Sequence, residues 1–311
     1  MTDWGKGTDV LEPLAVVRDL PLGLWSGRRD RTHLAGVGCY VMFVGYPRSG
    51  HSIIGSMLNA HPNVVAGHRV RVLRYAAAGF GREAILGMSM VADRRFERMG
   101  RIGSKRYDYR VPGQWQGRFS ELMVVGDTNV TNRFVQRRPE LLARLRNVLG
   151  IPVKLVHVVR NPFDNIATMS MRNRLTLTEA ADSYFDLCDG ATGIRTLVAD
   201  DEWLDLRHED VIGDAPTALA GLCAFLGVPA PPDYLADCDA IIYRKAHNSR
   251  HEVDWHPDVR ASVEKRMGAY PFLAGYAFDD APDDAGGAGG AGSAGSNGAA
   301  VDATEAPLPT N

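Results

Sequence analysis

Residues 45–52 have the types and spacing of a phosphate-binding loop. Gly45 and Gly50 stand at the two glycine positions of the nucleotide-binding pattern G-x-x-x-x-G-K-[ST], and Ser52 supplies its hydroxyl. His51 replaces the lysine of that pattern, and the nearest cation is Arg48. Nucleoside triphosphate chemistry uses the lysine as a compact charge on the terminal phosphates. The loop therefore argues against a kinase or NTPase, but it still favours binding of a phosphate-like anion.

A strand and a helix are expected on the two sides of this loop. Tyr40–Gly45 is apolar and β-branched, which is typical of a central parallel strand. A helix should open at His51 and Ser52, because apolar side chains follow at helical spacing at Ile53, Ile54, Met57 and Leu58. Such a unit aims several backbone N–H groups and a helix N-terminus at one point, which predicts an anion site.

A second segment carries another candidate phosphate site. The apolar run Val153–Val159 predicts a strand that ends at Arg160, and Asn161-Pro162 is a typical helix start. Thr168 follows eight residues after Arg160. A planar guanidinium holds two phosphate oxygens, and a hydroxyl farther along the helix takes a third. The alternative is an arginine at a sheet edge and a threonine bonded back to its own helix.

The two segments together resemble the donor motifs of sulfotransferases that use 3′-phosphoadenosine 5′-phosphosulfate (PAPS). Residues 47–52, Pro-Arg-Ser-Gly-His-Ser, resemble the 5′-phosphosulfate loop P-[KR]-[ST]-G-[ST]-[ST] of that family. Arg160 and Thr168 match its 3′-phosphate motif. Weaker similarity extends from about residue 39 to residue 278. It includes Leu204–Asp210 as a late strand ending in Glu-Asp, Ala224–Val228 as the end of the following helix, and Tyr270–Tyr276.

The resemblance implies PAPS as the donor and a set of donor-binding residues. A basic loop, Asn248–His251 followed by Trp255, is expected to fold over the 3′-phosphate of the donor. The donor-binding residues implied in this way are Arg48, Ser49, Gly50, His51, Ser52, Arg160, Thr168 and Arg250.

Sulfuryl transfer also needs charge stabilisation and a base. Arg48 suits the developing charge on the bridging oxygen, and it cannot itself transfer the proton because a guanidinium stays charged. Many bacterial relatives place a Glu base after the second strand, where this chain has Arg69. His68 beside it is our candidate base, or else a hydrogen-bonded histidine at a strand end. His51 and Asp127 are the other candidates.

Two regions between the donor motifs bear on the acceptor. Arg69, Arg71 and Arg74 form either a solvated basic face or a site for an acidic acceptor. Residues 106–118 are too irregular for a helix and rich in aromatic side chains, which fits a lid or binding loop as well as a surface loop pinned by its aromatics. Around them we expect a short strand at Asn63–Gly67, a strand at Met123–Gly126 and helices at Val70–Tyr75, Arg82–Met90 and Pro139–Leu149.

The whole chain has 311 residues and a formal net charge of −2. Alternating strands and helices predict an α/β class, with a P-loop-like central parallel sheet, helices on both faces and a single domain. We expect a partly ordered N-terminal arm at 1–35, the sulfotransferase-like domain at 36–278 and a disordered Ala/Gly-rich tail at 279–311.

Composition narrows the function classes. The near-neutral charge argues against nucleic acid as a partner, and no apolar run is long enough for a membrane span. Four cysteines without metal spacing are expected to be buried free thiols, we expect no metal, and a cytoplasmic, bacterial protein is our interpretation. Three functions remain open: a PAPS-dependent sulfotransferase acting on a glycan, lipid or natural product, a related nucleotide-binding protein that has lost catalysis, and a P-loop nucleotide kinase. The acceptor and the oligomeric state stay open.

Overall fold

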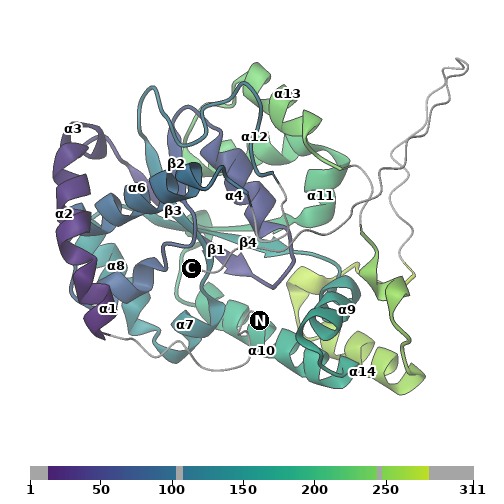
Figure 1. Ribbon diagram of the computed structural model, residues 1–311. Helices are drawn as coiled ribbons and strands as arrows, with labels where there is room; N and C mark the ends of the chain where they lie inside the picture. The colour runs from purple at the N-terminus through teal and green to yellow at the C-terminus, as the bar shows by residue number, and fades with distance from the viewer. Residues whose placement is uncertain (1–12, 103–107, 244–246, 280–311) are drawn as a thin grey trace, which may run out of the picture.

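Five parallel strands form the centre of the computed structural model, which describes residues 13–102, 108–243 and 247–279 (Figure 1). Every neighbouring pair runs parallel, so all five carboxyl ends lie at one edge of the sheet. This confirms the predicted single-domain α/β fold with a central parallel sheet. In spatial order the strands are β2 (Val64–Gly67), β3 (Val124–Val130), β1 (Cys39–Gly45), β4 (Val153–Val159) and β5 (Trp203–Arg207).

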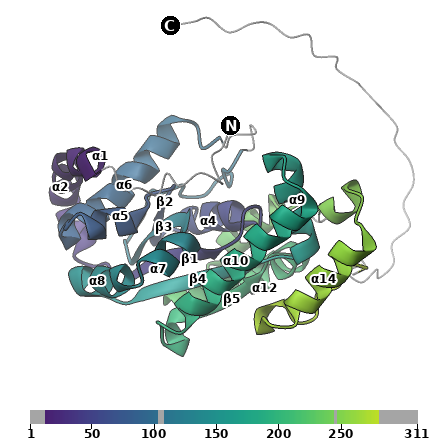
Figure 2. The ribbon, with the colours of Figure 1, turned by 90° about the horizontal axis from the view of Figure 1, so that it is seen from below.

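Helices cover both faces of this sheet (Figure 2). Side chains alternate along β1, so Tyr40 and Met42 face one core while Val41 and Phe43 face the other. The first core is closed by α5 (Val72–Ala77), α6 (Arg82–Arg98), α7 (Asn132–Arg137), α8 (Glu140–Leu149) and part of α10 (Leu177–Arg195). The second is closed by α4 (His51–Asn59), α11 (His208–Gly213), α12 (Ala215–Leu226) and α13 (Pro232–Ala240).

A third apolar cluster lies beyond the carboxyl end of β4. It joins α9 (Pro162–Asn173) and α10 to α14 (Pro257–Met267), and Figure 1 shows these helices together at one side of the molecule. Two short turns of 3-10 helix, Ser249–Glu252 and Pro271–Leu273, belong to the same region. This cluster supports the residues that follow β1 and β4, because Tyr46 and Val159 are both buried in it.

Three N-terminal helices pack beside the sheet domain. They are α1 (Pro13–Arg18), α2 (Leu20–Arg29) and α3 (Arg31–Leu34), and α2 lies along α6 (Figure 1). The two helix backbones approach closely, since a Cβ atom at Gly87 would lie 2.1 Å from the carbonyl oxygen of Gly23. Residues 1–12 of the expected arm and 280–311 of the expected tail lie outside the described residues.

Several element boundaries differ from the sequence expectations. The strand expected at Met123–Gly126 runs on to Val130, and Glu209-Asp210 lies in α11 rather than at the end of a strand. The helix expected at Arg82–Met90 continues to Arg98. The short strand expected at Asn63–Gly67 is β2, which begins one residue later, at Val64. Asn161 caps α9 as expected: its side chain accepts a hydrogen bond from the N–H of Phe163, and Pro162 is the first helical residue.

Three further findings concern membrane spans, metal ligands and cysteines among the described residues. None of their helices is both long and apolar enough to cross a membrane. In the same ranges no three His, Cys, Asp or Glu side chains gather as metal ligands. Cys39, Cys188, Cys223 and Cys238 are buried and unbridged.

Candidate functional site

The segment between β1 and α4, here called the β1–α4 loop (residues 46–50), is held by a set of short hydrogen bonds. The backbone N–H and the hydroxyl of Ser49 both donate to the carbonyl oxygen of Tyr46, at 3.2 and 2.9 Å. The N–H of Gly45 donates to Oδ1 of Asn132 at 2.9 Å. Gly50 is left-handed (φ 93°), and a Cβ there would lie 2.2 Å from the His208 ring. The loop thus presents the start of α4, where the N–H groups of His51 and Ser52 come before the first hydrogen bonds of the helix, which Ile53 and Ile54 donate to Gly50.

The lysine position of the loop carries no charge at neutral pH. Burial, with smaller contributions from the nearby Arg69 and Arg48, lowers the pKa of His51 to about 4. Its Nδ1 atom is buried and makes no hydrogen bond within the described residues. Arg48, in contrast, is exposed with a left-handed backbone (φ 70°). The charge that faces an anion here therefore comes from Arg48.

The second predicted segment meets the first at the carboxyl edge of the sheet. The guanidinium of Arg160 is buried, and its Nη1 donates to the carbonyl oxygen of Arg48 at 3.0 Å. Its Nη2 donates to the carbonyl oxygen of His247. Burial lowers the pKa of Arg160, and Asp164 and Glu209 oppose that shift. One side chain thereby joins both phosphate motifs.

Thr168 and Arg250 lie next to Arg160, but Arg250 differs from the sequence expectation. The hydroxyl of Thr168 donates to Oγ of Ser249 at 2.9 Å. We expected Arg250 on a basic loop over the donor. It lies instead in the 3-10 turn Ser249–Glu252, is 3% exposed, and forms an ion pair with Asp164 at 2.8 Å. A buried carboxylate stabilises a buried guanidinium, so this arginine is an internal part of the site wall.

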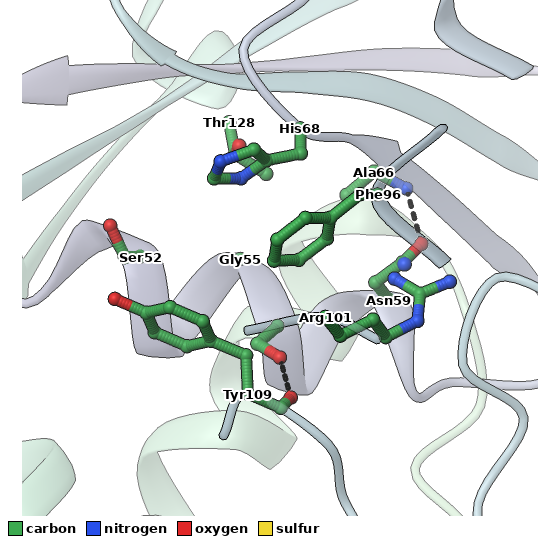
Figure 3. Close-up of a pocket in the computed structure, with 10 residues that line it drawn as sticks. Ser52, Gly55, Asn59, Ala66, His68, Phe96, Arg101, Tyr109 and Thr128 are labelled. Carbon is green, nitrogen blue, oxygen red and sulfur yellow. Dashed lines mark hydrogen bonds between the residues drawn. The ribbon is translucent and has the colours of Figure 1, made fainter. Parts of the chain in front are cut away.

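A small pocket opens beside Ser52, where α4 begins (Figure 3). In Figure 3, Ser52 and Tyr109 lie toward one end of the pocket and Asn59 and Arg101 toward the other. Its free space, about 10 Å³, holds roughly one water molecule. Arg101 is only 1% exposed and pairs with Asp93 at 2.9 Å, which gives this end of the pocket a fixed polar floor.

Two of the candidate bases, His68 and Asp127, lie in different surroundings. His68 lines the pocket together with Ser52. Burial, then Arg69 and Arg101, lowers its pKa to about 4, so its ring is neutral and able to accept a proton. Asp127 is fully buried, and its carboxylate accepts backbone N–H groups of Val70, Val72 and Asn129. It holds the chain after β2 in place and has no exposed surface.

Residues that the sequence reasoning missed also shape the site. Asn132 accepts a hydrogen bond from Gly45, and His208 packs beneath Gly50. Arg172 on α9 lies near Arg48, since burial and then the Arg48 charge lower its pKa. A polar residue that directly follows a strand, as His208 follows β5, was the available signal, because the carboxyl ends of parallel strands meet at one edge.

We compared the sequence with models of known protein families. The model of the sulfotransferase family matches residues 41–232. The chain belongs to the sulfotransferase family. The match includes both phosphate motifs, strands β2 to β5 and β1 from Val41 onward. No curated protein matches the chain.

Solved sulfotransferase structures resemble this sulfotransferase at low sequence identity. The sulfotransferase domain of the Synechococcus PCC 7002 olefin synthase is 14% identical, with 76% of this chain and 96% of that chain covered and a TM-score of 0.48. The sulfotransferase domain of the curacin biosynthetic pathway is 15% identical, with 75% and 98% covered and a TM-score of 0.48. Mouse sulfotransferase SULT7A1, complexed with PAP, is 12% identical, with 80% and 89% covered and a TM-score of 0.43.

Proposed function

We propose that this sulfotransferase uses PAPS as its donor and transfers the sulfuryl group to an acceptor hydroxyl of a glycan, lipid or natural product. The observation that carries the proposal is the hydrogen bond from Arg160 to the carbonyl oxygen of Arg48. It joins the loop suited to a phosphosulfate with the arginine suited to a second phosphate. A donor with anionic groups at both its 5′ and 3′ positions matches that pair.

The chain's own residues divide into two donor-binding groups. The N–H groups of Gly50, His51 and Ser52 and the hydroxyl of Ser52 would hold the 5′-phosphosulfate end, as at other helix N-termini. Ser49 would shape the loop instead, because its N–H and hydroxyl both donate to Tyr46. The orphan Nδ1 of His51 fits this role, because a buried polar atom without a partner is costly unless a ligand satisfies it. Arg160 and Thr168 would hold the 3′-phosphate, with Arg250 and Asp164 fixing the wall behind them.

The transfer needs little covalent help from the protein. The acceptor oxygen forms a bond to sulfur in line with the bond that breaks between sulfur and the phosphate oxygen, and 3′-phosphoadenosine 5′-phosphate (PAP) leaves. Arg48 stabilises the charge that develops on the leaving oxygen. His68 takes the proton of the acceptor hydroxyl. Its place in the pocket with Ser52 supports this assignment.

The acceptor would enter the pocket beside Ser52. His68, Phe96 and Tyr109 must shift to admit it, because the present free space is only about 10 Å³. Arg69 and Arg71 are exposed at the carboxyl end of β2 and would favour an acceptor with an acidic group. The four buried free thiols support a reducing cytoplasm as its compartment.

A turnover screen tests the proposal. The full-length protein is incubated with PAPS and a panel of sugars, uronates, phenols and long-chain alcohols, and PAP release is measured. We expect PAP release from PAPS with at least one hydroxyl acceptor, and no ADP release when ATP replaces PAPS, since His51 cannot replace the lysine of a kinase. PAP binding without turnover would support the alternative of a lost catalytic function, which Arg69 at the usual base position favours. Turnover of ATP would support the kinase instead.

A further inference from the structure

Three side chains form a hydrogen-bonded chain across the sheet to the β1–α4 loop. Oδ1 of Asp205 lies 2.6 Å from Nδ1 of His157, and Nε2 of His157 lies 3.0 Å from the hydroxyl of Tyr46. The register explains this meeting: His157 pairs with Asp205 of β5 on one side and with Val44 of β1 on the other. Tyr46 follows Val44 by two residues and so continues the same face of the sheet.

The chemistry of Asp205 fixes the direction of the first hydrogen bond. A carboxylate only accepts hydrogen bonds, so Nδ1 of His157 donates to Asp205. Nε2 of His157 is left to pair with the hydroxyl of Tyr46. The indole N–H of Trp203 also donates to Asp205, at 3.0 Å. Burial raises the pKa of Asp205, but the hydrogen bonds from His157 and Trp203 outweigh it and hold the pKa below its usual value.

The chain leads from solvent to the interior. The side chain of Asp205 is 53% exposed, whereas His157 and Tyr46 are fully buried. Packing fixes the two buried rings from the side, with Phe272 edge-on to His157 at 4.7 Å and Tyr184 at 4.7 Å from Tyr46. Such polar groups are rare in an apolar sheet face and must be bonded to be tolerated.

The backbone of Tyr46 also holds the conformation of the β1–α4 loop. Its carbonyl oxygen accepts both hydrogen bonds from Ser49, at 3.2 and 2.9 Å. A displaced Tyr46 would move this carbonyl and, with it, the N–H groups at the start of α4. The hydroxyl of Tyr46 faces the interior and does not contact the loop's anion site, so any effect on the donor must pass through the backbone.

We propose that His157 and Asp205 are positioning residues that act through the hydroxyl of Tyr46 to hold the β1–α4 loop in its anion-binding conformation. The inference rests on the proposed function only for the identity of the ligand. Neither His157 nor Asp205 is among the donor-binding residues that the sulfotransferase resemblance implies.

A double-mutant cycle tests this coupling, with PAP affinity measured by calorimetry on the full-length protein. Tyr46→Phe and His157→Leu should each weaken PAP binding about 5-fold, the size of one net hydrogen bond. If His157 acts through the Tyr46 hydroxyl, the double variant should bind no more weakly than either single variant. Asp205→Asn, which keeps an acceptor oxygen for Nδ1, should retain most of the affinity that Asp205→Ala loses.

Amide hydrogen exchange of the peptide covering residues 46–52, measured without any ligand, gives a second readout. We expect severalfold faster exchange in Tyr46→Phe and His157→Leu. His61→Leu is the matched control, because His61 is also fully buried and bonds Asn63 and Pro229 on the opposite face. It should lower stability without changing this exchange.

The outcomes distinguish the proposed function from the proposed coupling between His157, Tyr46 and the β1–α4 loop. If wild type does not bind PAP, the proposed function fails, and the exchange measurement still decides the coupling. If exchange of residues 46–52 stays at the wild-type rate in Tyr46→Phe and His157→Leu, the coupling is wrong. Additive losses of PAP affinity in the double variant would also contradict it, because they would show that His157 acts independently of Tyr46. Should His157→Leu fail to fold, Tyr46→Phe decides alone, since it removes a single oxygen atom.

Discussion

The imidazole of His68 stacks on the phenyl ring of Phe96, with the ring centroids 4.0 Å apart and the ring planes at 12° (Figure 3). The contact places the ring on the pocket wall and leaves it half-buried. An isolated histidine titrates near pH 6.5, but burial and the neighbouring Arg69 and Arg101 lower the pKa of His68 to about 4. The neutral ring is therefore available over the whole physiological range.

A pH–rate profile follows from this pKa. If His68 is the base, activity should rise through about pH 4 and stay level from pH 5 to 8. His68→Ala should lose about 10²–10⁴ in rate and keep its PAP affinity. A variant that remains active with the wild-type profile would exclude His68, and His51 would be the next residue to test.

Arg48 should act mainly on the transition state. It is exposed at the loop, where the charge of the leaving group develops. Arg48→Ala should lower kcat by on the order of 10²-fold, while PAP affinity falls much less. Steady-state kinetics at saturating donor, compared with calorimetry of PAP, measure the two effects. Normal turnover of the variant would contradict this role.

Gly50 should tolerate no side chain. Its left-handed backbone and the 2.2 Å approach of a Cβ to the His208 ring mean that Gly50→Ala strains the start of α4. We expect a loss of at least 1 kcal/mol in the free energy of unfolding, roughly the left-handed penalty alone, and weaker PAP binding. Gly221→Ala is the control, because its site in α12 is open, and it should leave both quantities equal or better.

Asp127 should give the fold a specific pH dependence. Burial raises its pKa to about 6, and hydrogen bonds from the backbone only partly offset this shift. Between pH 4 and 6 the folded state therefore holds a proton that the unfolded state has released, so this group's contribution to stability falls as pH rises. The fall is on the order of 3 kcal/mol.

Denaturant unfolding of wild type and Asp127→Asn at several pH values isolates that contribution. The variant should be less stable overall, because an amide satisfies fewer of the surrounding N–H groups. Its stability should lack the fall between pH 4 and 6 that wild type shows. Parallel pH curves for the two proteins would show that Asp127 is charged throughout and that its pKa is not raised.

The fold could be predicted because residues that are neighbours in the sequence mark each apolar strand and its ends. Val153–Val159 was predicted with both boundaries as observed, and Tyr40–Gly45 differs from β1 by one residue. Strand β3 was cut short in the prediction, because Asp127 and Thr128 look like a strand end while their polar groups are in fact satisfied by the chain around them.

The site was less predictable, because its contacts join residues far apart in the sequence. The ion pair that removes Arg250 from an open loop depends on Asp164, 86 residues away. The lowered pKa of His68 depends on burial that only the packed structure shows. Motifs of a few residues predicted a candidate anion site, but not which polar side chains support it.

Calorimetric titration of the full-length protein with PAP and ADP tests the central claim most directly. Arg160 and Thr168 should distinguish a 3′-phosphate, so PAP should bind more tightly than ADP by on the order of 1.5–3 kcal/mol, the value of a charge-assisted hydrogen bond. Arg160→Ala should lose that difference, while Arg266→Ala, whose arginine pairs with Asp182 on the surface, should keep it. Equal affinity of wild type for PAP and ADP, or an unchanged preference in Arg160→Ala, would contradict PAPS as the donor.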